Sequence, residues 1–170
     1  YCNFNGSIPF GIGELKNLVS LDLQSNSFSG TIPEDIQGCE MLENFAASNN
    51  MLDGNIPSSI GSLKSFKILK IHLSNLTYLN LLGNKLNGEI PSELNSLTQL
   101  QTLDLSENNL SGPIPLLNTK LQNLVSLVLS DNAFTGSIPS NFCLKGSSKL
   151  EQLFLSQNML FGNSPWSYST

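Results

Sequence analysis

The feature that most limits the fold is a four-residue phrase, Gly-x-Ile-Pro, which returns along the whole chain. Successive copies begin 24, 24, 34, 24 and 24 residues apart, and a degraded seventh copy follows 26 residues after the sixth. A second pattern, Leu-x-x-Leu-x-Leu-x-x-Asn, precedes the phrase and is clearest over residues 100–108 and 124–132. Two linked patterns with one period indicate an array of similar units that stack on one another. The phrase begins at Gly6, Gly30, Gly54, Gly88, Gly112, Gly136 and, degraded, Gly162.

The Leu-x-Leu core of the second pattern has the two-residue alternation of a β-strand. We number the unit from its first leucine, so that Leu103 and Leu105 hold positions four and six and face inward. Thr102, Asp104 and Ser106, at positions three, five and seven, then face outward. Stacking at the strand spacing of roughly 4.8 Å turns each leucine position into a continuous apolar column. Each buried leucine contributes about 1.5 to 3 kcal/mol, so the columns stabilise the array.

An asparagine at position nine is expected to bind backbone groups where the chain turns. Where the chain leaves the strand, buried backbone N–H and C=O groups lose their sheet partners, and each unpaired group costs about 1 to 3 kcal/mol. A short amide, which both donates and accepts, can satisfy them. Cys2 takes this place in the first partial unit. The predicted structural ladder is Asn26, Asn50, Asn84, Asn108, Asn132 and Asn158.

The full unit, L-x-x-L-x-L-x-x-N-x-L-x-G-x-I-P-x-x-L-x-x-L, resembles the plant-type leucine-rich repeat. That repeat is found in receptor kinase ectodomains, receptor-like proteins and polygalacturonase inhibitors, and the resemblance covers essentially the whole chain. It implies an α/β repeat solenoid: a curved, right-handed superhelix with a parallel concave β-sheet, a short second sheet, and 3-10 or short helices on the convex side. We expect one domain over residues 1–170, with about six to seven repeats, partial at both ends.

One repeat is irregular, over residues 66–76. Phe66, Leu69 and Ile71 fill positions one, four and six, but the following residues already match the tail of a repeat, so the join falls between Ile71 and His72. Three explanations stay open: residues absent from this sequence at the join, a deletion accommodated by one long distorted coil, or a helix over 63–76. The distance from Ile71 C to His72 N would separate the first from the others.

Composition excludes several classes of function. The net charge is −5 and eight lysines supply all the fixed positive charge, which weighs against binding to nucleic acid. No apolar run reaches the roughly 18 to 20 residues of a membrane span. The chain begins without Met and within a repeat, so we expect an internal stretch of a longer ectodomain or a chain whose caps are missing.

Catalytic and metal chemistry find little support in the sequence. Cys2, Cys39 and Cys143 form no CxxC or Cys/His cluster and are expected as buried free thiols. The single histidine, His72, stands beside the irregular join, and no nucleophile motif occurs. We therefore expect no enzyme activity, no cofactor and no metal.

The outward strand positions are the candidate binding surface. Asp22 and Asp104 make this surface mildly acidic, which suits a neutral or basic partner, while several apolar groups have no structural use there. Because Asp104 faces outward, we expect Asp104→Ala to leave stability nearly unchanged. Scattered surface residues with no partner are the alternative. The candidates are Asp22, Tyr78, Asn80, Leu82, Thr102, Asp104, Val128, Gln152 and Phe154.

The resemblance implies a non-catalytic recognition module, a segment of a plant receptor kinase ectodomain that binds a peptide, a protein or a co-receptor on its concave face. The alternatives are a secreted polygalacturonase inhibitor and a scaffold with no partner of its own. Three glycosylation sequons begin at Asn5, Asn75 and Asn109, each at a position expected to be exposed. With the resemblance they favour the plant cell surface or apoplast, and N-glycans on the chain.

Overall fold

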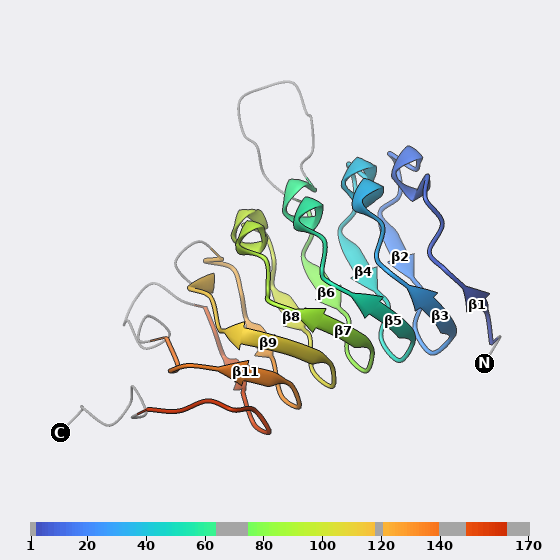
Figure 1. Ribbon diagram of the computed structural model, residues 1–170. Coiled ribbons are helices and arrows are strands. Elements are labelled where there is room, and N and C mark those ends of the chain that lie inside the picture. Colours follow the sequence, from blue (N-terminus) through green and yellow to red (C-terminus); the bar gives the residue numbers. More distant parts are fainter. Residues whose placement is uncertain (1–2, 64–74, 118–120, 140–148, 163–170) are drawn as a thin grey trace.

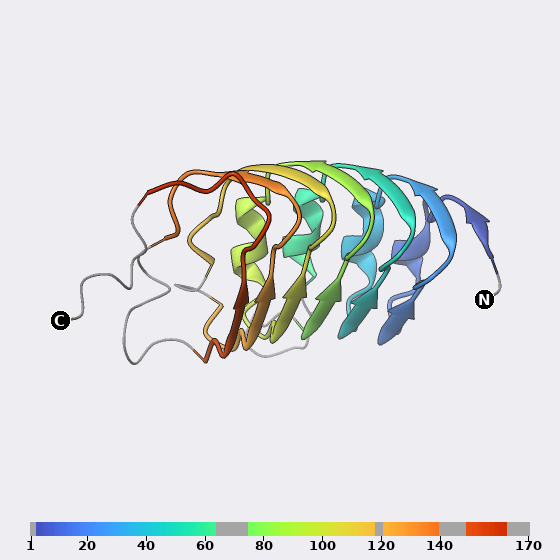
Figure 2. The ribbon, with the colours of Figure 1, turned by 90° about the horizontal axis from the view of Figure 1, so that it is seen from below.

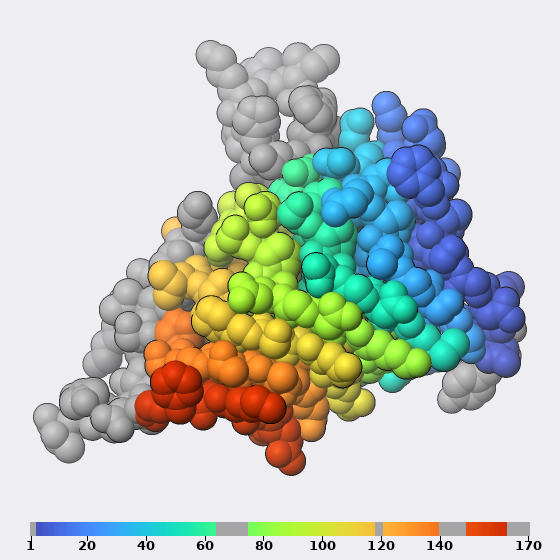
Figure 3. All heavy atoms as spheres, in the orientation of Figure 1, coloured from blue at the N-terminus to red at the C-terminus, as the bar shows by residue number. Residues whose placement is uncertain are grey.

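The computed structural model describes residues 3–63, 75–117, 121–139 and 149–162. Two parallel sheets and a row of short 3-10 helices wind into a solenoid, with one strand of each sheet in every described coil except the first and the last (Figures 1 and 2). Figure 3 shows successive coils as adjacent bands over the surface of the second sheet. The predicted leucine-rich repeat solenoid is therefore confirmed.

The elements follow the repeat closely. The first sheet has the order β12-β10-β8-β6-β4-β2 and the second the order β1-β3-β5-β7-β9-β11. The strands of the first sheet are β2 (Ser20–Asp22), β4 (Asn44–Ala46), β6 (Tyr78–Asn80), β8 (Thr102–Asp104), β10 (Ser126–Val128) and β12 (Gln152–Phe154). Those of the second are β1 (Asn5–Gly6), β3 (Ser27–Gly30), β5 (Met51–Gly54), β7 (Lys85–Gly88), β9 (Asn109–Pro113) and β11 (Ala133–Thr135). The 3-10 helices are η1 (Ile12–Glu14), η2 (Glu34–Gly38), η3 (Ser58–Ser62) and η4 (Ser92–Ser96).

Proline precedes three of the four 3-10 helices in the described ranges and sets where each of these begins. Pro33, Pro57 and Pro91 precede η2, η3 and η4 with ψ between 136° and 142°, so each helix begins only after the proline. No helix in the described ranges combines the length and the apolar character that crossing a membrane requires.

The core is the set of leucine columns. At position four, Phe45, Leu79, Leu103 and Leu127 are in register and fully buried. Leu21 and Leu153 occupy the same column in the outermost described coils and are only half-buried, because each has a neighbour on one side. The predicted inward face is correct, and the interior is one continuous cluster along the solenoid.

Asn108 illustrates how the position-nine side chain joins two coils. Its Oδ1 accepts a hydrogen bond from the Leu86 N–H at 3.0 Å, and its Nδ2 donates to the Leu81 oxygen at 3.0 Å, both in the preceding coil. The same Nδ2 also donates to the oxygens of Leu105 and Ser106 in its own coil. Asn50, Asn84, Asn132 and Asn158 repeat this arrangement. The ladder thus satisfies backbone groups of both coils as the chain turns.

A left-handed backbone accompanies the ladder. The residue before each ladder asparagine is left-handed, with φ between 53° and 57° at Ser25, Asn49, Glu107, Asp131 and Gln157. This conformation costs a non-glycine residue about 1 kcal/mol or more, so the surrounding bonds must hold it.

Gly88 shows why the phrase opens with glycine. Its φ is +75°, in the left-handed region, and an added Cβ would meet the side-chain oxygen of Asn55 in the preceding coil. The backbone angle therefore favours glycine at this position.

The irregular repeat does not interrupt the stacking. β4 pairs directly with β6, and Asn84 Nδ2 donates to the Ala47 oxygen at 3.0 Å, so no separate coil lies between them. The ten additional residues of this repeat, 34 against 24, fall between η3 and β6. Residues 66–71, His72 and the join lie outside the described residues.

Cys39 is a buried free thiol, as expected. Its Sγ donates to the Ile12 oxygen at 3.3 Å. Burial, and secondly the carboxylate of Asp35, raise the pKa of the Cys39 thiol, which keeps it protonated and unreactive. Cys2 and Cys143 lie outside the described residues.

The ladder yields a stability prediction. Asn108→Ala should lower the free energy of unfolding by about 1 to 3 kcal/mol, because it leaves the buried Leu86 N–H unpaired and removes one of two hydrogen bonds at each of three carbonyls. Urea unfolding followed by circular dichroism measures the change. Asn109→Ala is the matched control, since the exposed Asn109 should change stability by less than about 0.5 kcal/mol. Equal losses would contradict the ladder's role.

Candidate functional site: the outward strip of the first sheet

The outward side chains of the first sheet form what we call the concave strip. Position three supplies Ser20, Asn44, Tyr78, Thr102, Ser126 and Gln152, and position five supplies Asp22, Ala46, Asn80, Asp104, Val128 and Phe154. Position seven, just beyond each strand, adds Gln24, Ser48, Leu82, Ser106, Ser130 and Ser156. Because the strands pair in register, residues of one position form a row that crosses all six strands at roughly 4.8 Å per step.

The nine candidate residues all lie on this strip. Phe154 is 51% exposed, and Asp22 and Gln152 are also exposed. The others are half-buried by their neighbours: Tyr78, Asn80, Leu82, Thr102, Asp104 and Val128. The strip therefore collects onto one surface residues that are far apart in the sequence.

Polar residues at position five also have a structural part. Asp104 Oδ1 accepts hydrogen bonds from the Ser106 N–H at 3.0 Å and from the Ser106 hydroxyl at 2.6 Å. Asp22 binds the N–H and the side-chain amide of Gln24 in the same way. These bonds close the turn at the end of the strand, as Asp and Asn side chains commonly do. These bonds predict a measurable loss of stability in Asp104→Ala, where the sequence predicts almost none.

Asn80 makes the corresponding bond and also orients an aromatic neighbour. Its Oδ1 accepts from the Leu82 N–H at 3.0 Å, while its Nδ2 donates to the Tyr78 hydroxyl at 2.9 Å. The Tyr78 ring is thereby held on the strip before any partner arrives. An aromatic side chain fixed in this way loses little conformational entropy on contact.

The strip carries negative charge without compensating lysines. Segments 19–25, 43–49, 77–83, 101–107, 125–131 and 151–157, which span positions two to eight, contain no lysine. In the described ranges one ion pair occurs, Lys16–Glu40, and it lies outside these segments. Such a surface attracts a basic partner and disfavours an acidic one. The carboxylates in these segments are Asp22, Glu43, Asp104, Glu107, Asp131 and Glu151.

The three sequon asparagines differ in their surroundings. Asn5 in β1 and Asn109 in β9 are exposed, and both belong to the second sheet, away from the concave strip. Asn75 is half-buried, and its Nδ2, the atom that would carry a glycan, donates to the Glu40 oxygen at 3.2 Å. The expectation of full exposure therefore fails at Asn75.

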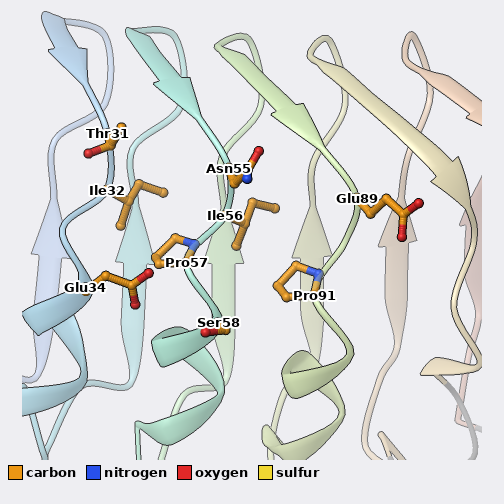
Figure 4. A pocket seen from close by; sticks show the side chains of 9 residues that line it. All are labelled: Thr31, Ile32, Glu34, Asn55, Ile56, Pro57, Ser58, Glu89 and Pro91. Atoms are coloured by element: carbon orange, nitrogen blue, oxygen red, sulfur yellow. The ribbon is translucent and has the colours of Figure 1, made fainter.

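A hollow of about 520 Å³ lies on a different side of the solenoid, where three Ile-Pro segments run beside one another (Figure 4). The buried Ile32 and Ile56 belong to its apolar wall, and Glu34 and Glu89 are exposed at its edge. The sequence did not predict this hollow, because residues 56 and 89 become neighbours only when the coils on either side of the 34-residue repeat stack directly. The lining is completed by Thr31, Asn55, Pro57, Ser58 and Pro91.

Neither surface offers a metal centre. Within the part of the chain that the structure describes, no three His, Cys, Asp or Glu residues gather to hold an ion. His72 lies outside that part. The chemistry available on the strip is therefore hydrogen bonding, carboxylate charge and apolar contact.

The fold and the strip define a repeat solenoid with an extended contact surface. The Leucine Rich Repeat family profile matches residues 17–39, 75–97, 99–121 and 123–144. The chain belongs to the leucine-rich repeat family. Comparison with curated proteins gives no match.

Solved structures of plant receptor kinase ectodomains are similar over most of the chain. The Arabidopsis receptor kinase HAESA, in complex with the peptide hormone IDA and the co-receptor SERK1, has 38% identity and a TM-score of 0.81; the match covers 92% of this chain and 24% of that one. The Arabidopsis thaliana GASSHO1/SCHENGEN3 ectodomain has 36% identity and a TM-score of 0.79, covering 93% and 18%. The Arabidopsis thaliana SOBIR1 ectodomain has 34% identity and a TM-score of 0.71, covering 82% and 71%. The chain thus spans 18 to 24% of the two larger ectodomains.

The turn-closing bond leads to a prediction that separates charge from hydrogen bonding. Asp104→Ala should lower the free energy of unfolding by about 1 kcal/mol through loss of the bonds to Ser106. Asp104→Asn should retain most of the stability, because an amide oxygen accepts the same bond at Asn80. Urea unfolding measures both. The second substitution creates an Asn-Leu-Ser sequon, so both variants are made in a host without N-glycosylation. Wild-type stability in Asp104→Ala would refute the structural part.

Proposed function

We propose that this chain is a non-catalytic recognition module that binds a peptide or protein partner along the concave strip. The observation that carries the proposal is an in-register outward surface on which Phe154 is 51% exposed and Val128 lies beside it, although neither serves the core. Exposed apolar groups on such a face favour contact with a partner. Tyr78, held by Asn80, adds a rigid aromatic contact.

Similarity to receptor ectodomains refines the proposal. HAESA is described in complex with the peptide hormone IDA and the co-receptor SERK1, and GASSHO1 in complex with CASPARIAN STRIP INTEGRITY FACTOR 2. By that similarity, we place this chain in a plant receptor kinase ectodomain, with a peptide ligand and a co-receptor as its partners. The proposal includes no cofactor and no nucleic acid. The acidic strip supports a neutral or basic ligand.

An extracellular location at the plant cell surface or apoplast belongs to the same proposal. The exposed sequons at Asn5 and Asn109 support it, because glycans there would project from the second sheet and leave the concave strip open. We do not extend the proposal to Asn75, since a glycan on its Nδ2 would displace the bond to the Glu40 oxygen.

The binding proposal predicts which substitutions weaken an interaction. Peptides selected from a random library against the folded chain are titrated by fluorescence anisotropy. Tyr78→Ala and Phe154→Ala should each weaken binding by about tenfold or more, because interface aromatics contribute on the order of 2 kcal/mol. Met51→Ala is the control, since Met51 is 41% exposed on the second sheet. If Met51→Ala weakened binding as much as the strip variants, or if neither strip variant changed the affinity, the binding site would not be the concave strip. Circular dichroism checks that each variant is folded.

The location proposal predicts a glycosylation pattern. Chain secreted from plant cells should carry glycans at Asn5 and Asn109, so Asn5→Gln and Asn109→Gln should each remove the mass of one glycan. Asn75→Gln should remove none. Intact-mass analysis before and after enzymatic deglycosylation measures this, and a glycan at Asn75, or none at the other two, would count against the proposal.

A further inference from the structure

Three consecutive strands place a carboxylate and two apolar groups in one row. Asp104 in β8 is the register partner of Val128 in β10, which in turn is the partner of Phe154 in β12. A carboxylate, an isopropyl group and a phenyl ring thus follow one another at position five. The β2–β6 half of the row has a different order, with Asp22, Ala46 and Asn80 in succession.

The charged end of this row remains available to a ligand. Asp104 uses Oδ1 for its bonds to Ser106, and across the described ranges Oδ2 has no hydrogen-bond partner. Glu107 and Asp131 are exposed just beyond β8 and β10 and reinforce the negative potential. With no lysine in the neighbouring segments, the group that complements this end is a cation.

The adjoining row can hold a peptide backbone. Thr102, Ser126 and Gln152 are register partners at position three, beside Asp104, Val128 and Phe154. Ser126 is buried, so the hydroxyl of half-buried Thr102 and the amide of exposed Gln152 are the groups that can donate to and accept from peptide groups that lose water on binding. A ligand lying across these three strands therefore meets a polar row beside the row of charge and apolar contact.

The dimensions select one spacing of ligand side chains. In an extended peptide, residues i and i+2 point the same way and lie roughly 6.6 Å apart. From β8 to the midpoint between β10 and β12 is one and a half strand steps, roughly 7 Å. A side chain over Asp104 and a second one between Val128 and Phe154 therefore match the i, i+2 spacing, whereas neighbouring residues of an extended peptide face opposite ways.

We propose that strands β8, β10 and β12 recognise an extended peptide through a basic residue and an apolar residue two positions apart. The basic side chain pairs with Asp104, and the apolar side chain packs between Val128 and Phe154. This inference rests on the proposed peptide-binding function and names the ligand chemistry of its C-terminal three strands.

The test uses heptapeptides of one composition that differ only in spacing. Gly-Ser-Lys-Ser-Phe-Ser-Gly carries the i, i+2 pair, and Gly-Ser-Ser-Lys-Phe-Ser-Gly carries the same residues side by side; both have blocked ends. NMR titration of isotope-labelled protein at low ionic strength gives the affinity and the residues perturbed. We expect the first peptide to bind about threefold to tenfold more tightly and to shift resonances of β8, β10 and β12.

Matched substitutions isolate the charge. Asp104→Asn keeps the turn-closing acceptor but removes the charge, and should weaken the first peptide about threefold to fivefold while leaving the Glu analogue of that peptide unweakened. Asp22→Asn removes a carboxylate that makes the same turn but has Ala46 as its neighbour, and should weaken the first peptide less than Asp104→Asn does. Val128→Ser should lower the affinity for the first peptide, but that affinity should depend on the charge at position 104 as it does in the wild type.

The possible results separate this inference from the function it rests on. If both peptides bind the strip equally, or Asp22→Asn acts like Asp104→Asn, the spacing rule is overturned and peptide binding stands. If library-selected peptides bind the strip but lack the spaced pair, the spacing rule again fails alone. If no heptapeptide and no library peptide perturbs the strip, both proposals fail together.

Discussion

The hydrogen bonds of the position-nine asparagines hold successive coils in register, and the concave strip depends on them. Asn108 bonds at once to the Leu86 N–H and Leu81 oxygen of one coil and to two oxygens of its own. Asn84 makes the same bonds across the 34-residue repeat, including one to the Ala47 oxygen. β4 and β6 therefore remain paired although ten additional residues separate them in the sequence. Because the ladder continues across the long repeat, the outward rows of the concave strip also continue across it.

The strip is not a surface whose side chains are all free. At Asp22, Asn80 and Asp104 the side-chain oxygen closes the turn after the strand, which ties these residues to local stability. Ala46, Val128 and Phe154 hold the same position and cannot make this bond, because their side chains have no polar atom. Ala46 is buried, but Val128 and Phe154 are turned outward in adjacent coils and give up a stabilising bond for apolar surface in water. Replacing a turn-closing polar residue with an outward apolar one does not help the chain to fold. Val128 and Phe154 therefore support a contact surface on β10 and β12.

Periodicity predicted the strands and the inward columns because the inward positions have one dominant requirement, whereas the second sheet and the short helices were implied by the family resemblance. Burial at every fourth and sixth position placed Leu79, Leu103 and Leu127 in the core, and the strands begin and end at positions three and five as the alternation implies. The turn at Asp104 was missed because it depends on local geometry, although Asp or Asn recurring at position five was a usable signal. The left-handed backbone at position eight had only a partial signal: Asn49, Gly83 and Asp131 favour it, but Ser25 and Glu107 do not. The hollow beside Ile56 and Glu89 was not predicted because these residues come from coils on either side of the 34-residue repeat. The spacing of motifs in the sequence does not show that these two coils stack directly.

Separation of the two faces explains how one backbone can present different ligand chemistry in successive coils. Asp104, Val128 and Phe154 occupy the same register position on strands with the same pairing, yet they are a charged, a branched and an aromatic residue. The inward columns and the asparagine ladder stabilise each coil whichever of these stands outside, so substitution at position five changes stability by about 1 kcal/mol, less than loss of a core leucine. Contact chemistry can therefore differ from coil to coil while the register stays constant. Because the register keeps the rows straight, an extended ligand meets these differences at regular intervals of one strand spacing, and the spacing of its side chains becomes the quantity that the surface selects.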